Sequence, residues 1–121
     1  MSSRRLLWKR KGGRDVYRGT TPTLTFTLPF EADRLDYLSI AFAQKATPYA
    51  KDATLVLEKE LRHCTLNGNA VVLELTENDT LALDCHFDVE IQLRAKCAGK
   101  SMASKIYTVP VKRILKDGCL P

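Results

Sequence analysis

The strictest pattern in this chain is an alternation of apolar and polar residues from position 85 to position 97. The apolar members are Cys85, Phe87, Val89, Ile91, Leu93, Ala95 and Cys97, and one polar or charged residue separates each from the next. Because successive side chains of a β-strand point to opposite faces, this period of two predicts one long strand with a buried face and a solvent face. Such a strand cannot bury its apolar face alone, so the chain must fold a second layer against it.

Shorter stretches of the same kind predict further strands. They lie at residues 23–28, 36–44, 54–61, 64–66, 71–75 and 102–115. Within residues 54–61 we expect Leu55 and Leu57 to be buried. Asn67–Gly68 predicts a tight hairpin turn, because both residue types tolerate positive φ. Pro110 has no N–H to donate to a ladder, so the last strand is expected to run along an edge or to carry a bulge.

The pattern leaves room for very little helix. Thr76, with an acid three positions later, resembles a capping box and predicts a single helical turn. No long amphipathic helix separates the strands, which excludes a parallel sheet with crossover helices. About seven short strands predict an all-β domain over residues 15–121, a single immunoglobulin-like antiparallel β-sandwich. A barrel would give the same pattern, and the Cys…Trp…Cys signature of immunoglobulin domains is absent, because the single Trp is Trp8.

The net charge of +5 has its source in the first 14 residues. Six cations precede the first acid, Asp15, whereas acids and bases nearly balance in the rest of the chain. We therefore predict a basic N-terminal arm over residues 1–14 that docks on a neighbouring subunit, because Trp and Arg commonly dominate interface energetics. The expected interface residues of this arm are Arg4, Arg5, Leu6, Leu7, Trp8, Lys9, Arg10, Lys11 and Arg14.

The length of 121 residues is that of one domain with a core of its own. No apolar run approaches the ~18 residues that would predict a membrane span. The basic start is not followed by the apolar region of about 7–15 residues that a signal peptide needs, so we expect synthesis in the cytoplasm. Under those reducing conditions the four cysteines are expected to be thiols.

Residues of reactive type form no recognised catalytic motif in this sequence. The pairs His63–Cys64 and Cys85–His86 contain the ligand types of a two-Cys, two-His zinc site. Neighbouring residues on a strand point to opposite faces, so each pair would supply both ligands only at a bulge or turn. We therefore expect no enzyme activity, no metal and no cofactor.

Two other binding functions remain as alternatives. The cations of the arm could neutralise phosphates and bind nucleic acid nonspecifically. Stacking on bases is not expected, because Phe26, Phe42 and Phe87 occupy inward positions of predicted strands. Alternatively, the loops at residues 45–52 and 98–101 could recognise a glycan or a host surface.

Three stretches of the chain resemble small structural proteins of bacteriophages and prophages of Gram-positive gut bacteria. They are residues 18–29 (RGTTPTLTFTLP), residues 75–81 together with 89–94, and residues 103–118 around Val109–Pro110–Val111. The Arg18–Gly19–Thr20 start before an alternating strand is similar to immunoglobulin-like modules of phage tails and baseplates. The resemblance covers residues 18–118, is structural rather than chemical, and implies no catalytic residues.

The resemblance and the basic arm together predict a non-enzymatic assembly subunit of a virion. Its expected partners are other virion proteins or copies of itself, in an oligomer. Nonspecific nucleic acid is a further expected partner of the arm, and no membrane is expected. The expected locations are the host cytoplasm, where the chain is made, and the virion.

Overall fold

The computed structural model describes residues 15–115 in full and, for residues 7–10, the course of the backbone. The strands are β1 Leu7–Arg10, β2 Val16–Tyr17, β3 Thr23–Thr27, β4 Tyr37–Gln44, β5 Thr54–Glu60, β6 Thr65–Asn67, β7 Ala70–Glu74, β8 Val89–Cys97, β9 Lys100–Ala103, β10 Tyr107–Val109 and β11 Val111–Lys112. The helical segments of the described chain are η1 Ala32–Arg34, η2 Leu61–His63 and α1 Glu77–Leu81.

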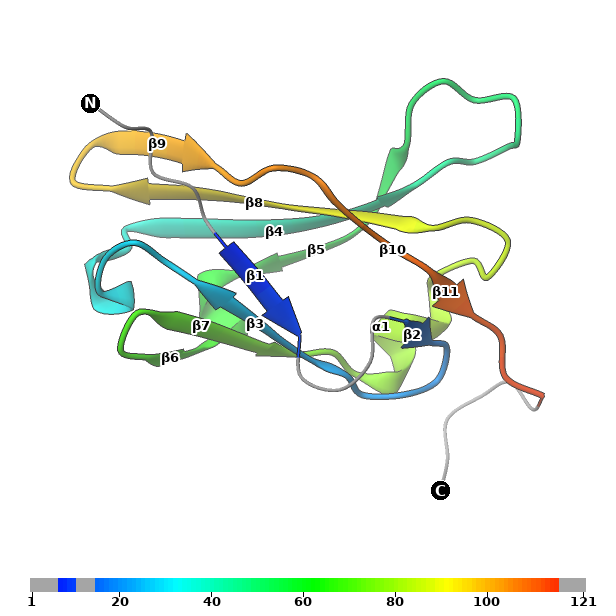
Figure 1. The fold of residues 1–121 in the computed structure, drawn as a ribbon, viewed down its shortest axis with the longest axis horizontal. Helices are drawn as coiled ribbons and strands as arrows, with labels where there is room; N and C mark the ends of the chain where they lie inside the picture. The colour runs from blue at the N-terminus through cyan, green and yellow to red at the C-terminus, as the bar shows by residue number, and fades with distance from the viewer. Residues whose placement is uncertain (1–6, 11–14, 116–121) are drawn as a thin grey trace.

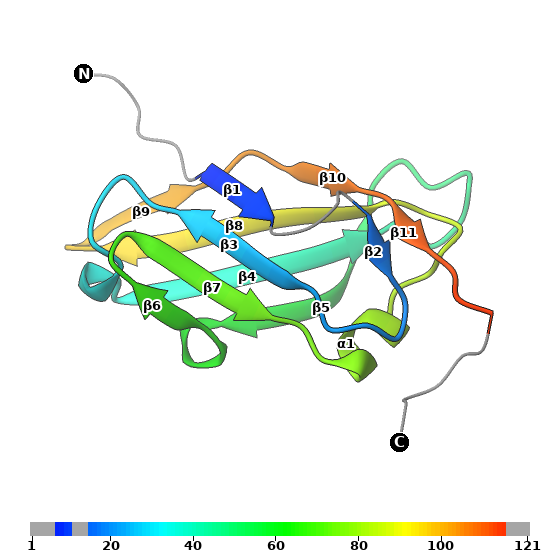
Figure 2. The ribbon, with the colours of Figure 1, turned by 60° about the horizontal axis from the view of Figure 1, so that its bottom comes forward.

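Two antiparallel sheets face each other across the core (Figure 1, Figure 2). One sheet has the strand order β1-β3-β7-β6. The other has the order β10-β8-β4-β5, and β9 also pairs with β8. Among the described strands each of these two sheets has edge strands of its own, so they form a sandwich and not a closed barrel. The predicted all-β sandwich is confirmed.

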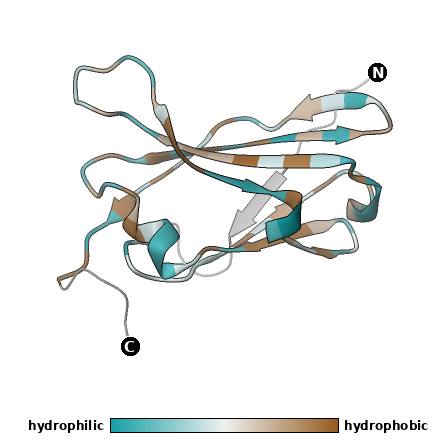
Figure 3. Cartoon of the chain, turned by 180° about the vertical axis from the view of Figure 1, so that it is seen from behind, coloured by the Kyte–Doolittle hydropathy of each residue, from teal (hydrophilic) through white to brown (hydrophobic). Residues whose placement is uncertain are grey.

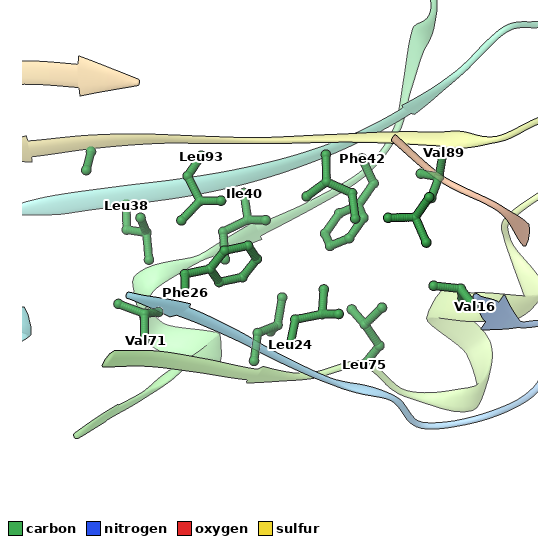
Figure 4. Close-up of a cluster of buried hydrophobic side chains, with 14 of the residues drawn as sticks. Val16, Leu24, Phe26, Leu38, Ile40, Phe42, Val71, Leu75, Val89 and Leu93 are labelled. Atoms are coloured by element: carbon green, nitrogen blue, oxygen red, sulfur yellow. The ribbon is translucent and has the colours of Figure 1, made fainter. Parts of the chain in front are cut away.

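The core lies where the alternation of the strands places apolar side chains between the sheets. Leu24 and Phe26 of β3 and Val71 of β7 face Ile40 and Phe42 of β4, and all five are at most 1% exposed (Figure 4). Further side chains of this layer are Leu38, Leu73, Val89, Ile91, Leu93 and Ala95. Complete burial of a side chain of this size is favourable by about 1.5–3 kcal/mol. The facing of the two sheets therefore follows from the period of two along their central strands.

The hairpin of β6 and β7 is present, but its turn is one position later than predicted. Asn67 pairs with Ala70, so the two loop residues are Gly68 and Asn69. Gly68 has a φ of 59°, and Asn69 does not have a positive φ. Glycine with positive φ at the first central position is the pattern of a type II′ turn. The predicted hairpin is thus formed, with Asn67 as the last residue of β6 and not in the loop.

Thr76 caps α1 at its N-terminal end, as predicted. Its Oγ1 accepts a hydrogen bond from the N–H of Asp79 (3.1 Å), and the Asp79 carboxylate accepts one from the N–H of Thr76 (2.9 Å). The residues of α1 are mostly hydrophilic (Figure 3). Among the described residues, no helix has the length and apolar content needed to cross a bilayer.

The strand predicted for residues 85–97 begins four residues late, at Val89. Residues 85–87 form a turn, in which the N–H of Phe87 donates to the carbonyl of Asp84 (3.4 Å). Cys85 and Phe87 are therefore only half-buried, and the expectation that Phe87 faces inward from a strand is wrong. A turn can mimic the period of two over a few residues, so the pattern did not mark the start of the strand.

The expected burial of Leu55 is also wrong. Leu55 pairs with Ala43 on the outer face of the sheet and is 59% exposed. Val56 is the extra residue of a bulge in β5, because Leu57 pairs with Phe42, the residue directly before Ala43. The bulge shifts the alternation of side chains by one residue, so Leu55 points to the outer face of the sheet although Leu57 points inward.

Pro110 separates β10 from β11 at the edge of the five-stranded sheet, as its missing N–H predicts. β10 pairs with β8, whereas β11 pairs in parallel with β2. The carbonyl of Pro110 accepts a hydrogen bond from the N–H of Val16 (2.9 Å), and that of Lys112 accepts one from the N–H of Arg18 (3.0 Å). β2 and β11 thus form a two-stranded ribbon at one end of the sandwich (Figure 2).

Candidate functional site

The predicted arm contains β1, which pairs with β3 of the same chain. The register is antiparallel, with Leu7 opposite Thr27, Trp8 opposite Phe26, Lys9 opposite Thr25 and Arg10 opposite Leu24. For these four arm residues the structure describes the backbone alone. The other predicted interface residues, Arg4, Arg5, Leu6, Lys11 and Arg14, lie outside the described residues. In this structure part of the arm is therefore an edge strand of the sandwich, and docking on a neighbouring subunit stays a prediction.

The outer face of the five-stranded sheet carries a groove of about 460 Å³. Small side chains of β4, Ala41 and Ala43, line it together with Gln92 of β8 and with Ile106, which is 54% exposed. The loop after β4 borders the groove through residues 45 and 51–53, and it projects beyond the sheets (Figure 1). Of the two loops predicted for ligand recognition, residues 45–52 thus lie beside a groove, whereas residues 98–99 form a tight turn between β8 and β9.

β5 is an edge strand, but two features oppose the pairing of a further strand with it. The first is the bulge at Val56. The second is Lys59, which is paired with the buried Ile40 and whose Nζ lies 3.0 Å from the carboxylate of Asp79. Bulges and inward-pointing charges are features by which natural sheets protect their edges. Contacts to this sheet are therefore favoured at the side chains of its outer face.

A second candidate site lies in the turn between α1 and β8. Asp84, Cys85 and His86 each offer one metal-ligating atom, and these atoms all lie within 4.8 Å of one another. His86 is hydrogen-bonded twice to Asp84 Oδ1, through its backbone N–H (2.8 Å) and through Nδ1 (2.7 Å). A groove of about 370 Å³ lies beside the turn, lined by Arg18 and residues 81–86. We expected no pair of metal ligands at Cys85 and His86, because neighbouring side chains of a strand point to opposite faces. Both residues lie in a turn, so this reason does not apply.

Two polar side chains from distant parts of the sequence hold this turn. Gln44 is 4% exposed, and its Nε2 donates to the carbonyls of Asp84 (2.8 Å) and Phe87 (3.0 Å). Its Oε1 accepts from the N–H of Asp84 (2.9 Å). Arg18 donates through Nε to the carbonyl of Leu83 (2.8 Å) and through Nη2 to that of Leu81 (3.0 Å). The turn is therefore fixed at both ends by side chain to backbone hydrogen bonds.

The pKa of the Asp84 carboxyl lies below its ordinary value. The main cause is the hydrogen bond from the backbone N–H of His86, followed by the hydrogen bond and charge of the His86 ring, with a smaller contribution from the charge of Arg18. All of these stabilise the ionised form. Asp84 is thus a carboxylate at neutral pH, with its side chain half exposed to solvent.

The side chains of the other Cys–His pair, His63–Cys64, form hydrogen bonds with the nearby backbone of Glu60. His63 Nδ1 accepts a hydrogen bond from the N–H of Glu60 (3.0 Å), and Cys64 Sγ donates to the carbonyl of the same residue (3.5 Å). Burial raises the pKa of the Cys64 thiol to about 11, although the charge of Lys59 lowers it. Among the described residues, the ligand atoms of His63 and Cys64 do not join those of Cys85 and His86 in one cluster.

The sequence patterns pointed to neither Gln44 nor Arg18. Gln44 has a signal in the sequence, because it continues the inward series of Leu38, Ile40 and Phe42 with a polar residue. A buried amide at such a position requires hydrogen-bond partners. Arg18 precedes a glycine and has no comparable signal. Its role depends on α1 lying beside residues 18–20, where Thr80 Oγ1 also bonds to the backbone of Thr20 (3.1 and 2.8 Å).

No protein-family model matches the chain, and no curated protein matches it in sequence. Among solved structures, the fold is similar to that of the superoxide reductase (neelaredoxin) from Ignicoccus hospitalis, with a TM-score of 0.51. The two sequences are 11% identical, and the match covers 88% of this chain and 80% of the neelaredoxin chain. At this identity the likeness concerns the fold alone.

This comparison corrects the expectation that the chain is not an enzyme. That expectation relied on the absence of recognised catalytic motifs in the sequence. The neelaredoxin is an enzyme built on a similar fold, so the fold does not argue against catalysis. The lack of sequence motifs has little weight either, because the Asp84–Cys85–His86 turn has no motif and yet brings three reactive side chains together.

Proposed function

We propose that the chain is an assembly subunit of a bacteriophage or prophage structural module, and that its N-terminal arm links neighbouring copies. The main support is the fit of the Leu7–Arg10 backbone to the outer edge of β3. Four consecutive residues pair in register, and β3 has no other strand on that side among the described residues. The resemblance of residues 18–118 to phage tail and baseplate modules supports the same class of function.

The physical basis is that the edge of β3 needs a cover. Without β1, the strand Thr23–Thr27 would present unpaired N–H and C=O groups to solvent. The arm of a neighbouring copy has the same sequence, so it can form the same hydrogen bonds with β3. Exchange of an identical element between copies is a low-cost route to oligomers. The arm then acts as the link between subunits, and its cations contact the neighbour.

The test is the solution mass by light scattering, at low and high salt, of the intact chain and of a chain that lacks residues 1–14. Lys9→Pro is the sharper variant, because proline removes a backbone N–H from β1 and cannot continue the ladder. Lys9→Ala is its matched control, since it removes the same charge and keeps the N–H. We expect an oligomer for the intact chain and for Lys9→Ala, and monomers for Lys9→Pro and the truncated chain. A monomeric intact chain under all conditions would overturn the proposal.

A second candidate function is recognition of a glycan in the groove on the five-stranded sheet. The groove offers Glu90, Gln92 and Asp52 as partners for sugar hydroxyls, with the exposed Ile106 beside them. On this proposal, Gln92→Ala abolishes retention on a glycan array and loss of residues 1–14 does not affect it. Retention that survives Gln92→Ala and is lost with residues 1–14 would favour a binding role of the arm over one of the groove. Nonspecific nucleic-acid binding through the arm stays a prediction, to be checked by the salt dependence of DNA binding.

A further inference from the structure

The turn at residues 84–86 contains three types of ligand that zinc prefers, a carboxylate, a thiol and an imidazole. Their ligating atoms lie within 4.8 Å of one another, and Asp84 Oδ1 lies 2.7 Å from His86 Nδ1. With metal–ligand bonds of about 2.0–2.3 Å, neighbouring ligands of a tetrahedral site are about 3.5 Å apart. Side-chain rotations that move these atoms by roughly 1 Å are therefore enough to bring them to the distances of a coordination shell.

We infer that Asp84, Cys85 and His86 bind one divalent ion of the zinc class, with a fourth position open to water. Thiolate and imidazole ligands select such ions over Mg²⁺ and Ca²⁺, which prefer oxygen ligands. The adjacent groove of about 370 Å³ gives the fourth ligand access. On binding, the Cys85 thiol loses its proton to solvent, and the Asp84–His86 hydrogen bond is replaced by bonds to the ion.

The backbone of this turn is already in place before any ion binds. The buried Gln44 fixes Asp84 and Phe87, the residues on either side of Cys85 and His86. It donates to both carbonyls and accepts from the N–H of Asp84. Arg18 fixes the preceding carbonyls of Leu81 and Leu83. Binding therefore orders only side chains, and a preorganised site loses less conformational entropy when it binds its ligand.

The charge balance also favours a cation. Asp84 and the Cys85 thiolate give two negative charges, against the single positive charge of Arg18. The guanidinium of Arg18 donates to two carbonyl oxygens and is thereby held against the backbone. It lowers the affinity for a cation without cancelling the charge of the ligands.

The test uses the full chain, reduced and treated with a chelator, titrated with Co²⁺ and then with Zn²⁺. A cobalt–thiolate charge-transfer band in the near ultraviolet reports coordination by cysteine, and calorimetry gives the stoichiometry. We expect one ion per chain, displacement of Co²⁺ by Zn²⁺, and loss of the band in Cys85→Ser. Asp84→Asn and His86→Ala should weaken binding about tenfold or more. Asn at position 84 retains the oxygen that accepts the N–H of His86, so the turn is kept.

His63→Ala and Cys64→Ser are the matched controls. They remove the same ligand types from the other Cys–His pair, whose side chains hydrogen-bond to the backbone of Glu60. Both should leave the stoichiometry and the cobalt band unchanged, with a thermal melt confirming that each variant is folded. Three results would each overturn the inference: no ion bound by the intact chain, a band that persists in Cys85→Ser, or a band that disappears in Cys64→Ser.

Discussion

The side-chain amide of Gln44 hydrogen-bonds to both the N–H and the carbonyl of Asp84, as a paired strand would. Gln44 is the last residue of β4, and Asp84 lies 40 positions further along the chain, between α1 and β8. A third bond joins Gln44 to the carbonyl of Phe87 (3.0 Å). One buried side chain thereby connects the end of a central strand to the turn that carries the proposed metal ligands.

Gln44→Leu should destabilise the domain by about 3 kcal/mol, because it leaves one N–H and two carbonyls without their partner in a buried environment. Gln92→Leu is the matched control, since Gln92 is half-buried and its Nε2 makes one bond, to the carbonyl of Ser104 (2.9 Å). We expect this control to cost about 1 kcal/mol. Urea unfolding measures both, and equal costs for the two variants would contradict the role assigned to Gln44.

Asp79 should make stability dependent on pH in the acid range. Burial alone raises its pKa, but the N–H of Thr76 and the ammonium of Lys59 outweigh this effect, so the pKa lies below its ordinary value. A carboxyl whose pKa is lowered by folding stabilises the fold above the pKa of the unfolded chain, about 4. That stabilisation is lost as the pH falls through the folded pKa.

Asp79→Asn should therefore cost about 1 kcal/mol at pH 7 and reduce the fall in stability below pH ~4. Asp33→Asn, at an exposed position of η1, is the comparison variant and is expected to change stability at pH 7 by less than about 0.5 kcal/mol. Urea unfolding between pH 2 and pH 7 gives the answer, and an unchanged acid dependence in Asp79→Asn would refute the assignment.

The turn between β8 and β9 contains a strained residue. Ala98 has a φ of 51° and Gly99 a φ of 77°, the combination of a type I′ turn. Ala98→Asn should stabilise the domain by about 0.5 kcal/mol, because Asn tolerates this conformation better than Ala. Gly99→Ala should destabilise it by about 1 kcal/mol through the backbone alone, since no atom lies within 4 Å of the added Cβ. Thermal melts should show opposite shifts, and shifts of the same sign would be incompatible with this turn.

Cys64 should react slowly with iodoacetamide in the folded protein. Its pKa of about 11 leaves very little thiolate at neutral pH, and the thiolate is the nucleophile. Because the pKa is raised, the rate should increase as the pH approaches 11. Peptide mapping by mass spectrometry measures the labelling of Cys64 at pH 7 to 9 in native and urea-unfolded protein. Equal rates in the two states would show that burial does not protect the thiol.

Much of the sandwich was predictable, because burial on one face leaves a record in the sequence. Leu24 with Phe26, and Ile40 with Phe42, occupy the inward positions that their alternation indicates. Leu55 was mispredicted because the bulge at Val56 is set by pairing with β4, and a single strand carries no sign of its partner's register. The turn at residues 85–87 was mispredicted because three or four residues are too few to separate an alternating strand from a turn.

The candidate sites were less predictable than the fold. His86 and Cys85 were recognised as ligand types, but their convergence with Asp84 depends on the turn that Gln44 holds from 40 positions away. The basic arm was recognised by its charge, whereas its pairing with β3 depends on backbone groups that every residue possesses. Long-range hydrogen bonds of this kind leave no periodic pattern in the sequence.

The ribbon of β2 and β11 also limits when its two strands can pair during translation, because they lie far apart in the sequence. The N–H groups of Val16 and Arg18 donate to the carbonyls of Pro110 and Lys112, which are made much later than their donors. These two hydrogen bonds can therefore form only after the ribosome has reached residue 112. Until then β2, whose strand partner among the described residues is β11, has no strand to pair with.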